Sequence, residues 1–379
     1  MTTTTSVENP LKQLTRFGQS IWLDYIRRSL MTGGELKRLI EQDGLGGMTS
    51  NPTIFEKAIT GGSEYADQLG ELRQDKSLDA KGIYERLAIR DIQDAADILR
   101  PVYDGTRKRD GYVSLEVAPF LANETRPTID EARRLWKTVD RPNVMIKVPG
   151  TAAGLPAIET LLGEGININI TLLFSQDVYQ EVALAYIRAL EKCAERGIEL
   201  AGVASVASFF VSRIDTLVDS LIDAKAPKAA PDERERLESL RSKVAIANAK
   251  LAYERYQHIF SGVRWDALKD RGAQTQRVLW ASTSTKNPKL SDVLYIEELI
   301  GSDTVNTIPP ATYDAFRDHG VPRASLQSGL EDAREVMSKL AACGISMKEV
   351  THTLVIQGVK LFSDAFEKLL AAVKPAATS

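Results

Sequence analysis

The sequence predicts an α/β protein built as a closed parallel (β/α)8 barrel, the TIM-barrel architecture, in a single domain with helical insertions. Two observations carry this prediction. Eight short β-type runs alternate with longer helical patterns from near the start of the chain to its end. The chain has 379 residues, a length that suits one such barrel with insertions. Eight strands that are each followed by a helix favour a closed barrel over an open sheet.

The expected strands are short apolar runs that lie between turn signals. They cover residues 21–26, 47–50, 112–117, 144–148, 167–174, 203–209, 278–283 and 304–308. Helical patterns separate them, as in residues 84–99, where apolar side chains recur every three or four positions.

Local capping signals place several helix ends. A hydroxyl residue followed three positions later by glutamate is typical of a capping box at a helix start. Three such pairs are present: Thr128 with Glu131, Ser328 with Glu331, and Ser346 with Glu349. Two helices are expected to end at Gly320 and Gly344, because glycine is common just past a helix.

The widest interval between expected strands separates the sixth from the seventh. It holds an Ala/Lys/Pro segment, 224–232, and a charged helical stretch, 233–258. This interval resembles an interdomain linker, but the alternation of strands and helices resumes after it. We therefore expect one barrel domain over residues 1–379, with frayed tails at both ends. The insertion at 225–262 is expected to form either a lid or an oligomer contact.

Composition excludes several classes of protein. Lys plus Arg is 48 and Asp plus Glu is 51, so the net charge is -3 and gives no sign of a nucleic-acid partner. Two cysteines, Cys193 and Cys343, cannot form a disulfide framework or a four-thiolate zinc site, and both are expected to be packing residues in a reducing compartment. No apolar run approaches the ~20 residues that span a bilayer, and the start lacks the features of a signal peptide. We expect a cytoplasmic protein with no membrane partner.

Polar residues occupy one face of several expected strands. Successive side chains in a strand point to opposite faces, and the apolar face of a barrel strand meets the helices. The opposite face would carry Asp24, Glu116, Lys147, Asn169 and Thr171 into the barrel. One reading is a structural network of ion pairs. However, buried charges are costly and rarely accumulate without a function, so the five together favour an active site.

Lys147 is the most informative of these residues. An amine attacks a carbonyl only when it is unprotonated, and burial among apolar neighbours would lower its pKa, whereas a nearby carboxylate would raise it. The sequence leaves the sign of the net shift open. Such a lysine forms Schiff bases with carbonyl substrates, and Glu116 and Asp24 would supply the proton transfers.

Other chemistries have less support. The three histidines, His258, His319 and His352, lie far apart and outside the expected strands, so no metal site is expected. The glycine pairs near positions 46 and 61 lack the strand-to-helix context of a nucleotide-binding loop.

With these residues in place, the chain resembles the transaldolases, Schiff-base transferases of the pentose phosphate pathway in carbohydrate metabolism. Seven segments carry the resemblance, in order along successive expected strands. They are WLDY at 22–25, TSNPT at 49–53, SLEV at 114–117, IKVPGT at 146–151, NINITLLFS at 167–175, SFFVSR at 208–213 and ASTSTKNP at 281–288.

The resemblance implies a role for each matched residue. Lys147 would form the imine, Glu116 would act with a water on the carbinolamine, Asp24 would take a hydroxyl proton, and Thr171 would help to hold the water. The implied substrate-binding residues are Asn51, Asn169, Ser208, Phe210, Arg213, Ser282 and Lys286. Among these, Arg213 would grip the phosphate, for which its fork of donors is suited.

The chain departs from better-known members of the family at two positions. Phe209 stands where they have proline, and Ser284 stands where they have a second arginine. We expect Lys286 to bind the phosphate in place of that arginine. The competing interpretation of Arg213 is a helix-start cation paired with Asp215 or Asp219.

The resemblance implies transfer of a dihydroxyacetone unit from sedoheptulose 7-phosphate to glyceraldehyde 3-phosphate, without a metal or organic cofactor. The products would be erythrose 4-phosphate and fructose 6-phosphate. The alternative is a fructose 6-phosphate aldolase, which as a group has glutamine at Glu116 and tyrosine at Phe210. An inactive sugar-phosphate-binding protein is an alternative from another class. The expected partners are sugar phosphates, and the expected assembly is a monomer or a homodimer.

Overall fold

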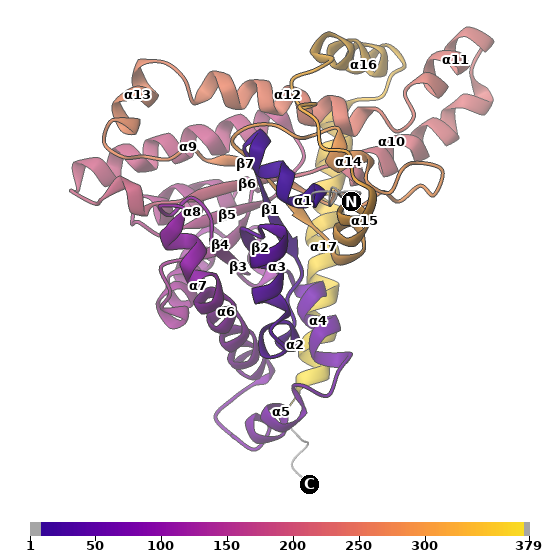
Figure 1. Ribbon diagram of the computed structural model, residues 1–379. Coiled ribbons are helices and arrows are strands. Elements are labelled where there is room, and N and C mark those ends of the chain that lie inside the picture. Colours follow the sequence, from indigo (N-terminus) through magenta and orange to yellow (C-terminus); the bar gives the residue numbers. More distant parts are fainter. Residues whose placement is uncertain (1–8, 375–379) are drawn as a thin grey trace, which may run out of the picture.

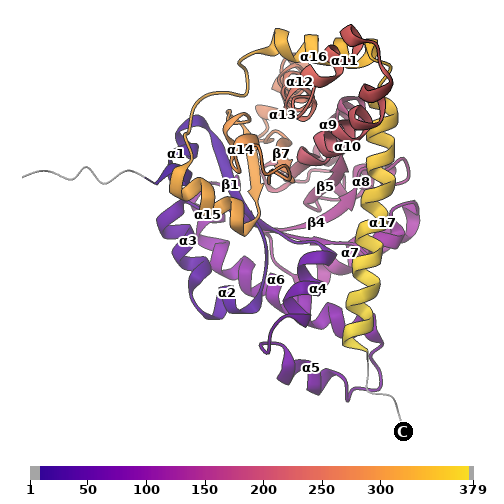
Figure 2. The same ribbon diagram turned by 90° about the vertical axis from the view of Figure 1, so that its right-hand side faces the viewer.

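The computed structural model describes residues 9–374, and within them eight parallel strands form one closed barrel (Figures 1 and 2). The strands pair in sequence order and the last pairs with the first. The expected frayed tails, apart from Lys374, lie outside the described residues. The strands are β1 (Gln19–Asp24), β2 (Gly47–Thr49), β3 (Tyr112–Glu116), β4 (Val144–Pro149), β5 (Ile168–Leu173), β6 (Ser205–Phe210), β7 (Arg277–Ala281) and β8 (Thr304–Ile308).

The barrel prediction is confirmed, and all eight expected strands are present with ends that differ by no more than two residues. The helices before the insertion are α1 (Pro10–Gln13), α2 (Arg28–Thr32), α3 (Glu35–Asp43), α4 (Pro52–Thr60), α5 (Ala66–Leu72), α6 (Ala80–Gly105), α7 (Thr125–Val139), α8 (Gly154–Leu162), α9 (Gln176–Glu195) and α10 (Ser212–Lys225). Those that follow are α11 (Pro231–Ser239), α12 (Val244–Ile259), α13 (Val263–Lys269), α14 (Leu294–Glu297), α15 (Pro310–His319), α16 (Leu330–Ala342) and α17 (Met347–Val373). Four 3-10 turns join them: η1 (Leu14–Phe17), η2 (Pro119–Leu121), η3 (Leu200–Gly202) and η4 (Ala226–Lys228).

The insertion between β6 and β7 is part of the helical layer that surrounds the barrel. The single helical stretch expected at 233–258 is divided between α11 and α12. Helix α12 packs against α9, α10 and α16, and Asn248 donates a hydrogen bond to the Phe174 carbonyl at the end of β5. The insertion is therefore hydrogen-bonded to the carboxyl end of β5.

The expected side-chain cap at a helix start is present at one of the three predicted capping boxes. Ser346 accepts a hydrogen bond from the Glu349 amide and caps α17, as predicted. Thr128 instead lies inside α7, where its hydroxyl donates to the Leu121 carbonyl. The Ser328 hydroxyl donates to the Ser325 carbonyl while α16 begins after Gly329. These two predictions are wrong because Ser and Thr hydroxyls also satisfy carbonyls in turns and helix interiors.

Both expected glycine positions lie at helix ends. Gly320 is the C-cap of α15, and Gly344 follows α16 with a φ of 68°. Cys193 and Cys343 are free and buried, in agreement with a packing role.

The amino-terminal end of the barrel is sealed by a buried ion pair. Arg277 at the start of β7 lies 2.9 Å from Asp110, which also accepts a hydrogen bond from the Trp22 indole at 2.9 Å. The Ser20 hydroxyl completes the group by accepting from Arg277 at 2.6 Å. Because this end is filled, ligands reach the interior from the carboxyl ends of the strands. No helix within residues 9–374 is both long and apolar enough to cross a membrane.

The turn into β3 requires glycine at position 111. Gly111 has a φ of 86°, and a Cβ built there would lie 2.3 Å from the Tyr103 amide nitrogen. We predict that Gly111→Ala destabilises the fold by more than about 2 kcal/mol, since it adds a backbone clash to an unfavourable φ. Thermal unfolding should show a melting temperature several degrees lower.

The matched control is Gly105→Ala at the end of α6, where an added Cβ meets no atom within 4 Å. Alanine there should leave the melting temperature unchanged or raise it slightly. Equal melting temperatures for the two variants would contradict the explanation.

Candidate active site

A cleft of about 300 Å³ opens at the carboxyl ends of the strands. Eight of the predicted site residues line it: Asp24, Asn51, Lys147, Ser208, Phe210, Arg213, Ser282 and Lys286. The other three, Glu116, Asn169 and Thr171, are buried in the barrel. The structure therefore brings together residues from seven strands or strand ends that are far apart in the sequence.

Lys147 lies in the middle of β4, and its side chain is only 5% exposed. Its Nζ donates a hydrogen bond to the Ser50 carbonyl at 3.1 Å and lies 3.5 Å from Glu116 Oε2. The ring of Phe362 from α17 lies 5.8 Å from the same nitrogen. The amine thus has one carboxylate, one carbonyl and one aromatic ring around it in a nearly dry site.

The position of Glu116 beside Lys147 follows from the register of the sheet, in which the two residues pair directly across β3 and β4. Burial raises the pKa of Glu116 to about 7, against the opposing effect of the Lys147 charge. A carboxyl group with a pKa near neutrality can both donate and accept a proton at physiological pH, as general acid–base catalysis requires.

Asp24 ends β1 and lies partly open to the cleft. Its carboxylate accepts a hydrogen bond from Thr49 at 2.7 Å, and the Thr49 hydroxyl lies 2.6 Å from that of Thr307. Burial raises the pKa of Asp24, while Lys147, Thr49 and Arg213 act in the opposite direction. The site therefore holds two carboxyl groups that are both harder to ionise than in water.

Thr171 is buried without a hydrogen-bond partner for its hydroxyl, and both carboxylate oxygens of Glu116 also lack one. Unpaired buried polar atoms are costly, and a bound water is the usual way to satisfy them. The two residues come from β3 and β5, the strands on either side of β4 and its Lys147. This pattern fits a water beside the amine.

A chain of hydrogen bonds crosses the barrel beside the amine. The Asn169 amide donates to the Ser114 hydroxyl at 3.0 Å and accepts from the Ser208 hydroxyl at 2.7 Å. Asn169 is fully buried and holds Ser208 at the floor of the cleft. Asn51 also has a structural task, because its side-chain oxygen caps α4 through the Ile54 amide at 3.0 Å.

The positive end of the cleft contains Arg213 at the start of α10. Its guanidinium carbon lies 5.4 Å from the Phe210 ring and 6.0 Å from the Phe362 ring. Burial lowers the pKa of Arg213, and the negative charge of Asp24 partly opposes this. The guanidinium therefore faces the cleft between two aromatic rings.

The pairing of Arg213 with Asp215 or Asp219 is not found. Asp215 accepts hydrogen bonds from the Ala245 amide and the Tyr295 hydroxyl, and Asp219 accepts from Ser242. The sequence could not exclude this pairing, because the partners of both aspartates come from the distant insertion and from α14.

Two lysines extend the positive end. Lys286 donates a hydrogen bond to Ser284 at 2.6 Å. Ser284 stands at the position of the family's second arginine, and it orients the lysine that we expect to take the place of that arginine. Lys57 on α4 also lines the cleft and was missed by the sequence reasoning. Burial and the charges of Arg213 and Lys57 lower the pKa of Lys286. Without the fold, Lys57 looks like any exposed helix lysine.

Two residues at this end adopt a left-handed backbone conformation without being glycine. Ser282 has a φ of 57°, and Leu172 has a φ of 60° where the pairing of β5 with β6 shifts its register. Such conformations cost roughly 1–3 kcal/mol each and cluster at functional sites. Leu172 therefore departs from regular strand geometry near the carboxyl end of β5.

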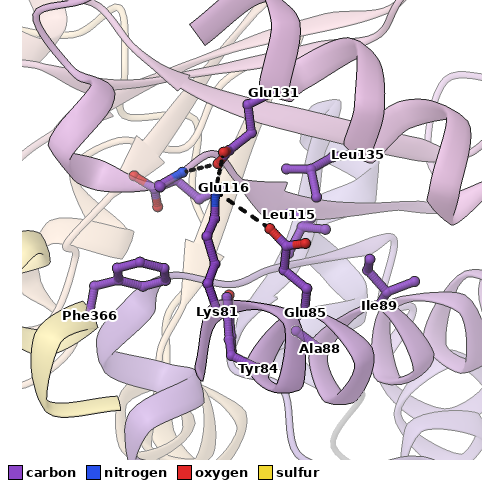
Figure 3. Close-up of a pocket in the computed structure, with 11 residues that line it drawn as sticks. Lys81, Tyr84, Glu85, Ala88, Ile89, Leu115, Glu116, Glu131, Leu135 and Phe366 are labelled. Carbon is purple, nitrogen blue, oxygen red and sulfur yellow. Dashed lines mark hydrogen bonds and ion pairs between the residues drawn. The ribbon is translucent and has the colours of Figure 1, made fainter. Parts of the chain in front are cut away.

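The outer side of β3 has its own polar network (Figure 3). Glu131 on α7 accepts a hydrogen bond from the Ala118 amide at 2.7 Å and is paired with Lys81 on α6. Lys81 also lies 3.7 Å from Glu85. The network connects the turn after Glu116 to α6 and α7. Glu131, which the sequence predicted as part of a capping box, has its place in this network instead.

Residues 9–374 contain no group of three His, Cys, Asp or Glu side chains that could hold a metal ion. His319 contacts Asp292 at 3.0 Å on the exposed surface.

Comparison with known proteins agrees with this geometry. The family model described as transaldolase/fructose-6-phosphate aldolase matches residues 21–373. Similar curated proteins include transaldolase 2 of Nostoc sp., which is 47% identical over 97% of each chain. The transaldolase of Trichodesmium erythraeum is 46% identical over 97% of each chain. That of Parafrankia sp. is 48% identical over 97% of this chain and 98% of the relative. The chain belongs to the transaldolase/fructose-6-phosphate aldolase family.

Proposed function

We propose that this chain catalyses the transaldolase reaction, in which a dihydroxyacetone unit passes from sedoheptulose 7-phosphate to glyceraldehyde 3-phosphate through a lysine Schiff base. Erythrose 4-phosphate and fructose 6-phosphate are the products, and the reaction belongs to the non-oxidative pentose phosphate pathway. The observation that carries the proposal is the buried Lys147 amine 3.5 Å from Glu116, in a cleft that also holds Asp24 and a cluster of cations. The names of the relatives support the same activity.

The first chemical step in this proposal is imine formation. The Lys147 amine adds to the ketose carbonyl, and protonated Glu116 then donates its proton, through a water held by Thr171, to the departing hydroxyl. The raised pKa of Glu116 supports this role, because about half of the groups carry the proton at pH 7.

Asp24 performs the bond-breaking step. Its carboxylate takes the proton of the hydroxyl at the scissile bond, the carbon–carbon bond breaks, and the electron pair moves into the imine to form an enamine. The aldose leaves while the three-carbon unit stays on Lys147. The enamine then attacks the carbonyl of the acceptor aldehyde, and the steps reverse to release the new ketose.

The phosphate is assigned to the positive end of the cleft. Arg213 binds it, with Ser282, Lys286 and Lys57 as further ligands. None of the three cations has a carboxylate partner at ion-pair distance within the described residues, so a dianion is the complementary ligand. Ser208, Asn51 and Asn169 would hold the sugar hydroxyls beside Phe210.

The alternative activity, fructose 6-phosphate aldolase, has less support. Glu116 and Phe210 are the residues that favour a transferase over that group; Phe210 lines the cleft and Glu116 is buried beside Lys147. We further propose one barrel domain that acts in the cytoplasm, as a monomer or a homodimer, on sugar phosphates.

Trapping tests the Schiff base directly. After incubation with fructose 6-phosphate and borohydride, mass spectrometry should find a three-carbon adduct on Lys147 and none on Lys286, which is exposed at the same cleft. Lys147→Met should abolish both adduct and turnover, because it removes the nucleophile. An unmodified Lys147 in folded, ligand-binding protein would refute the mechanism.

The pH dependence of imine formation tests Glu116. Since the pKa of Glu116 is about 7 and its protonated form is the acid, the rate of adduct formation should fall as the pH rises through about 7. Glu116→Gln should be slower at every pH and should lack this decline. Persistence of the same decline in the variant would assign it to another group.

Kinetics of phosphate-site variants test the cations. Loss of one charge-assisted contact should raise KM for fructose 6-phosphate about tenfold or more, with a larger effect for Arg213→Lys than for Lys57→Ala or Lys286→Ala. Inhibition by inorganic phosphate should weaken in parallel. Lys137→Ala, an exposed lysine of α7 outside the cleft, is the control and should change neither constant. Unchanged phosphate inhibition in all three cleft variants would refute the assignment.

A further inference from the structure

Helix α17 is the long carboxyl-terminal element that covers one side of the cleft. In Figure 2 it runs along the molecule from near α10 to α4. It packs against α4, α6, α10 and β5, so it connects the elements that carry Lys57, Arg213 and Thr171. Its place over the site has no counterpart in the motifs that the sequence analysis singled out.

Gly358 permits the close approach of α17 to the barrel. A Cβ built at this position would lie 2.7 Å from Leu172 Cδ2 and 3.7 Å from an Arg213 guanidinium nitrogen. Leu172 is the residue with the positive φ at the irregularity in β5. Leu172 and Gly358 are therefore in direct contact, and this contact sets how closely α17 approaches the barrel.

Phe362 lies one turn further along α17, and residues four apart share a helix face. It is therefore on the face that Gly358 holds against the barrel, and it is only 4% exposed. Its ring centroid is 5.8 Å from Lys147 Nζ and 6.0 Å from the Arg213 guanidinium carbon. One buried ring thus covers both the reactive amine and the phosphate-binding cation.

The other contacts of the amine are polar. They are the Ser50 carbonyl and the Glu116 carboxylate, which attract water. Phe210 differs from Phe362, because its ring contacts Arg213 and Phe174. Phe362 is consequently an apolar cover over the Lys147 amine.

We propose that Phe362 is a positioning residue that excludes water from the three-carbon unit on Lys147 and so favours transfer over hydrolytic release. This inference rests on the proposed function, because it concerns the fate of the same enamine.

The enamine has two possible fates. In transfer, its carbon attacks the carbonyl of an acceptor aldehyde. In release, that carbon takes the proton that Asp24 acquired during cleavage, which gives the imine of dihydroxyacetone. Water then adds to the imine carbon, the carbinolamine loses the amine, and dihydroxyacetone and free Lys147 are formed. This water replaces the one lost during imine formation. Transfer ends with the same hydrolysis of an imine, so the two fates diverge at the enamine carbon, where water that reaches the carbon relays the proton from Asp24 and commits the unit to release.

The experiment compares two rates in Phe362→Ala and the parent protein. One is release of glyceraldehyde 3-phosphate from fructose 6-phosphate without acceptor, and the other is transfer to erythrose 4-phosphate. We expect the ratio of release to transfer to rise about tenfold in Phe362→Ala. The amount of three-carbon adduct on Lys147 that borohydride can trap should also decline faster after the substrate is removed.

Two variants separate this effect from general damage to α17. Leu369→Ala truncates a fully buried residue of the same helix that does not line the cleft, and it should lower stability without changing the ratio. Phe362→Leu keeps an apolar side chain over the amine and should return the ratio close to that of the parent.

Parallel loss of both rates in Phe362→Ala at an unchanged ratio would overturn the proposal, as would an equal rise in Leu369→Ala. Failure of the proposed function itself would look different. In that case the parent protein would give no adduct on Lys147 and no transfer, whatever residue stands at position 362.

Discussion

The site depends on placing one amine and two carboxyl groups together in the interior of a closed barrel. Lys147 and Glu116 are 3.5 Å apart and each less than a tenth exposed, and Asp24 lies close enough to raise the pKa of Glu116. Isolated charges in such a place would be prohibitive, but opposite charges and directed hydrogen bonds offset part of the desolvation. The desolvation that remains raises the pKa of both carboxyl groups, that of Glu116 to about 7, and shifted pKa values of this kind are typical of sites of proton transfer.

The rest of the fold maintains this arrangement from three sides. Below, the pair of Arg277 and Asp110 fills the amino-terminal end, so the interior opens at one end. Around the wall, the insertion holds the ends of β5 and α10 through Asn248 and Ala245. Above, α17 places Phe362 over the amine. These contacts join segments that lie far apart along the chain.

Sequence reasoning succeeded where the signal repeats along the chain. Eight strands were located because burial on both faces leaves short apolar runs between turns, and alternation indicated that Asp24, Glu116 and Lys147 share a face. It failed where one local pattern has several physical uses. Thr128 and Ser328 carry the letters of a capping box, yet their hydroxyls donate to nearby carbonyls. The positive φ of Leu172, where the pairing of β5 with β6 is irregular, has no marker in the sequence.

The sequence by itself determined the barrel, the lysine and its two carboxyl partners, since strand periodicity is a local property and parallel strands in register bring equivalent positions together. Only the tertiary structure decided which groups surround them. The partners of Asp215, the convergence of Lys57 with Arg213 and Lys286, and the placement of Phe362 over Lys147 all join elements whose separation along the chain carries no information about distance. Their positions follow from the packing of α4, α12 and α17 against the closed barrel, and packing depends on the whole surface of each helix rather than on any short motif.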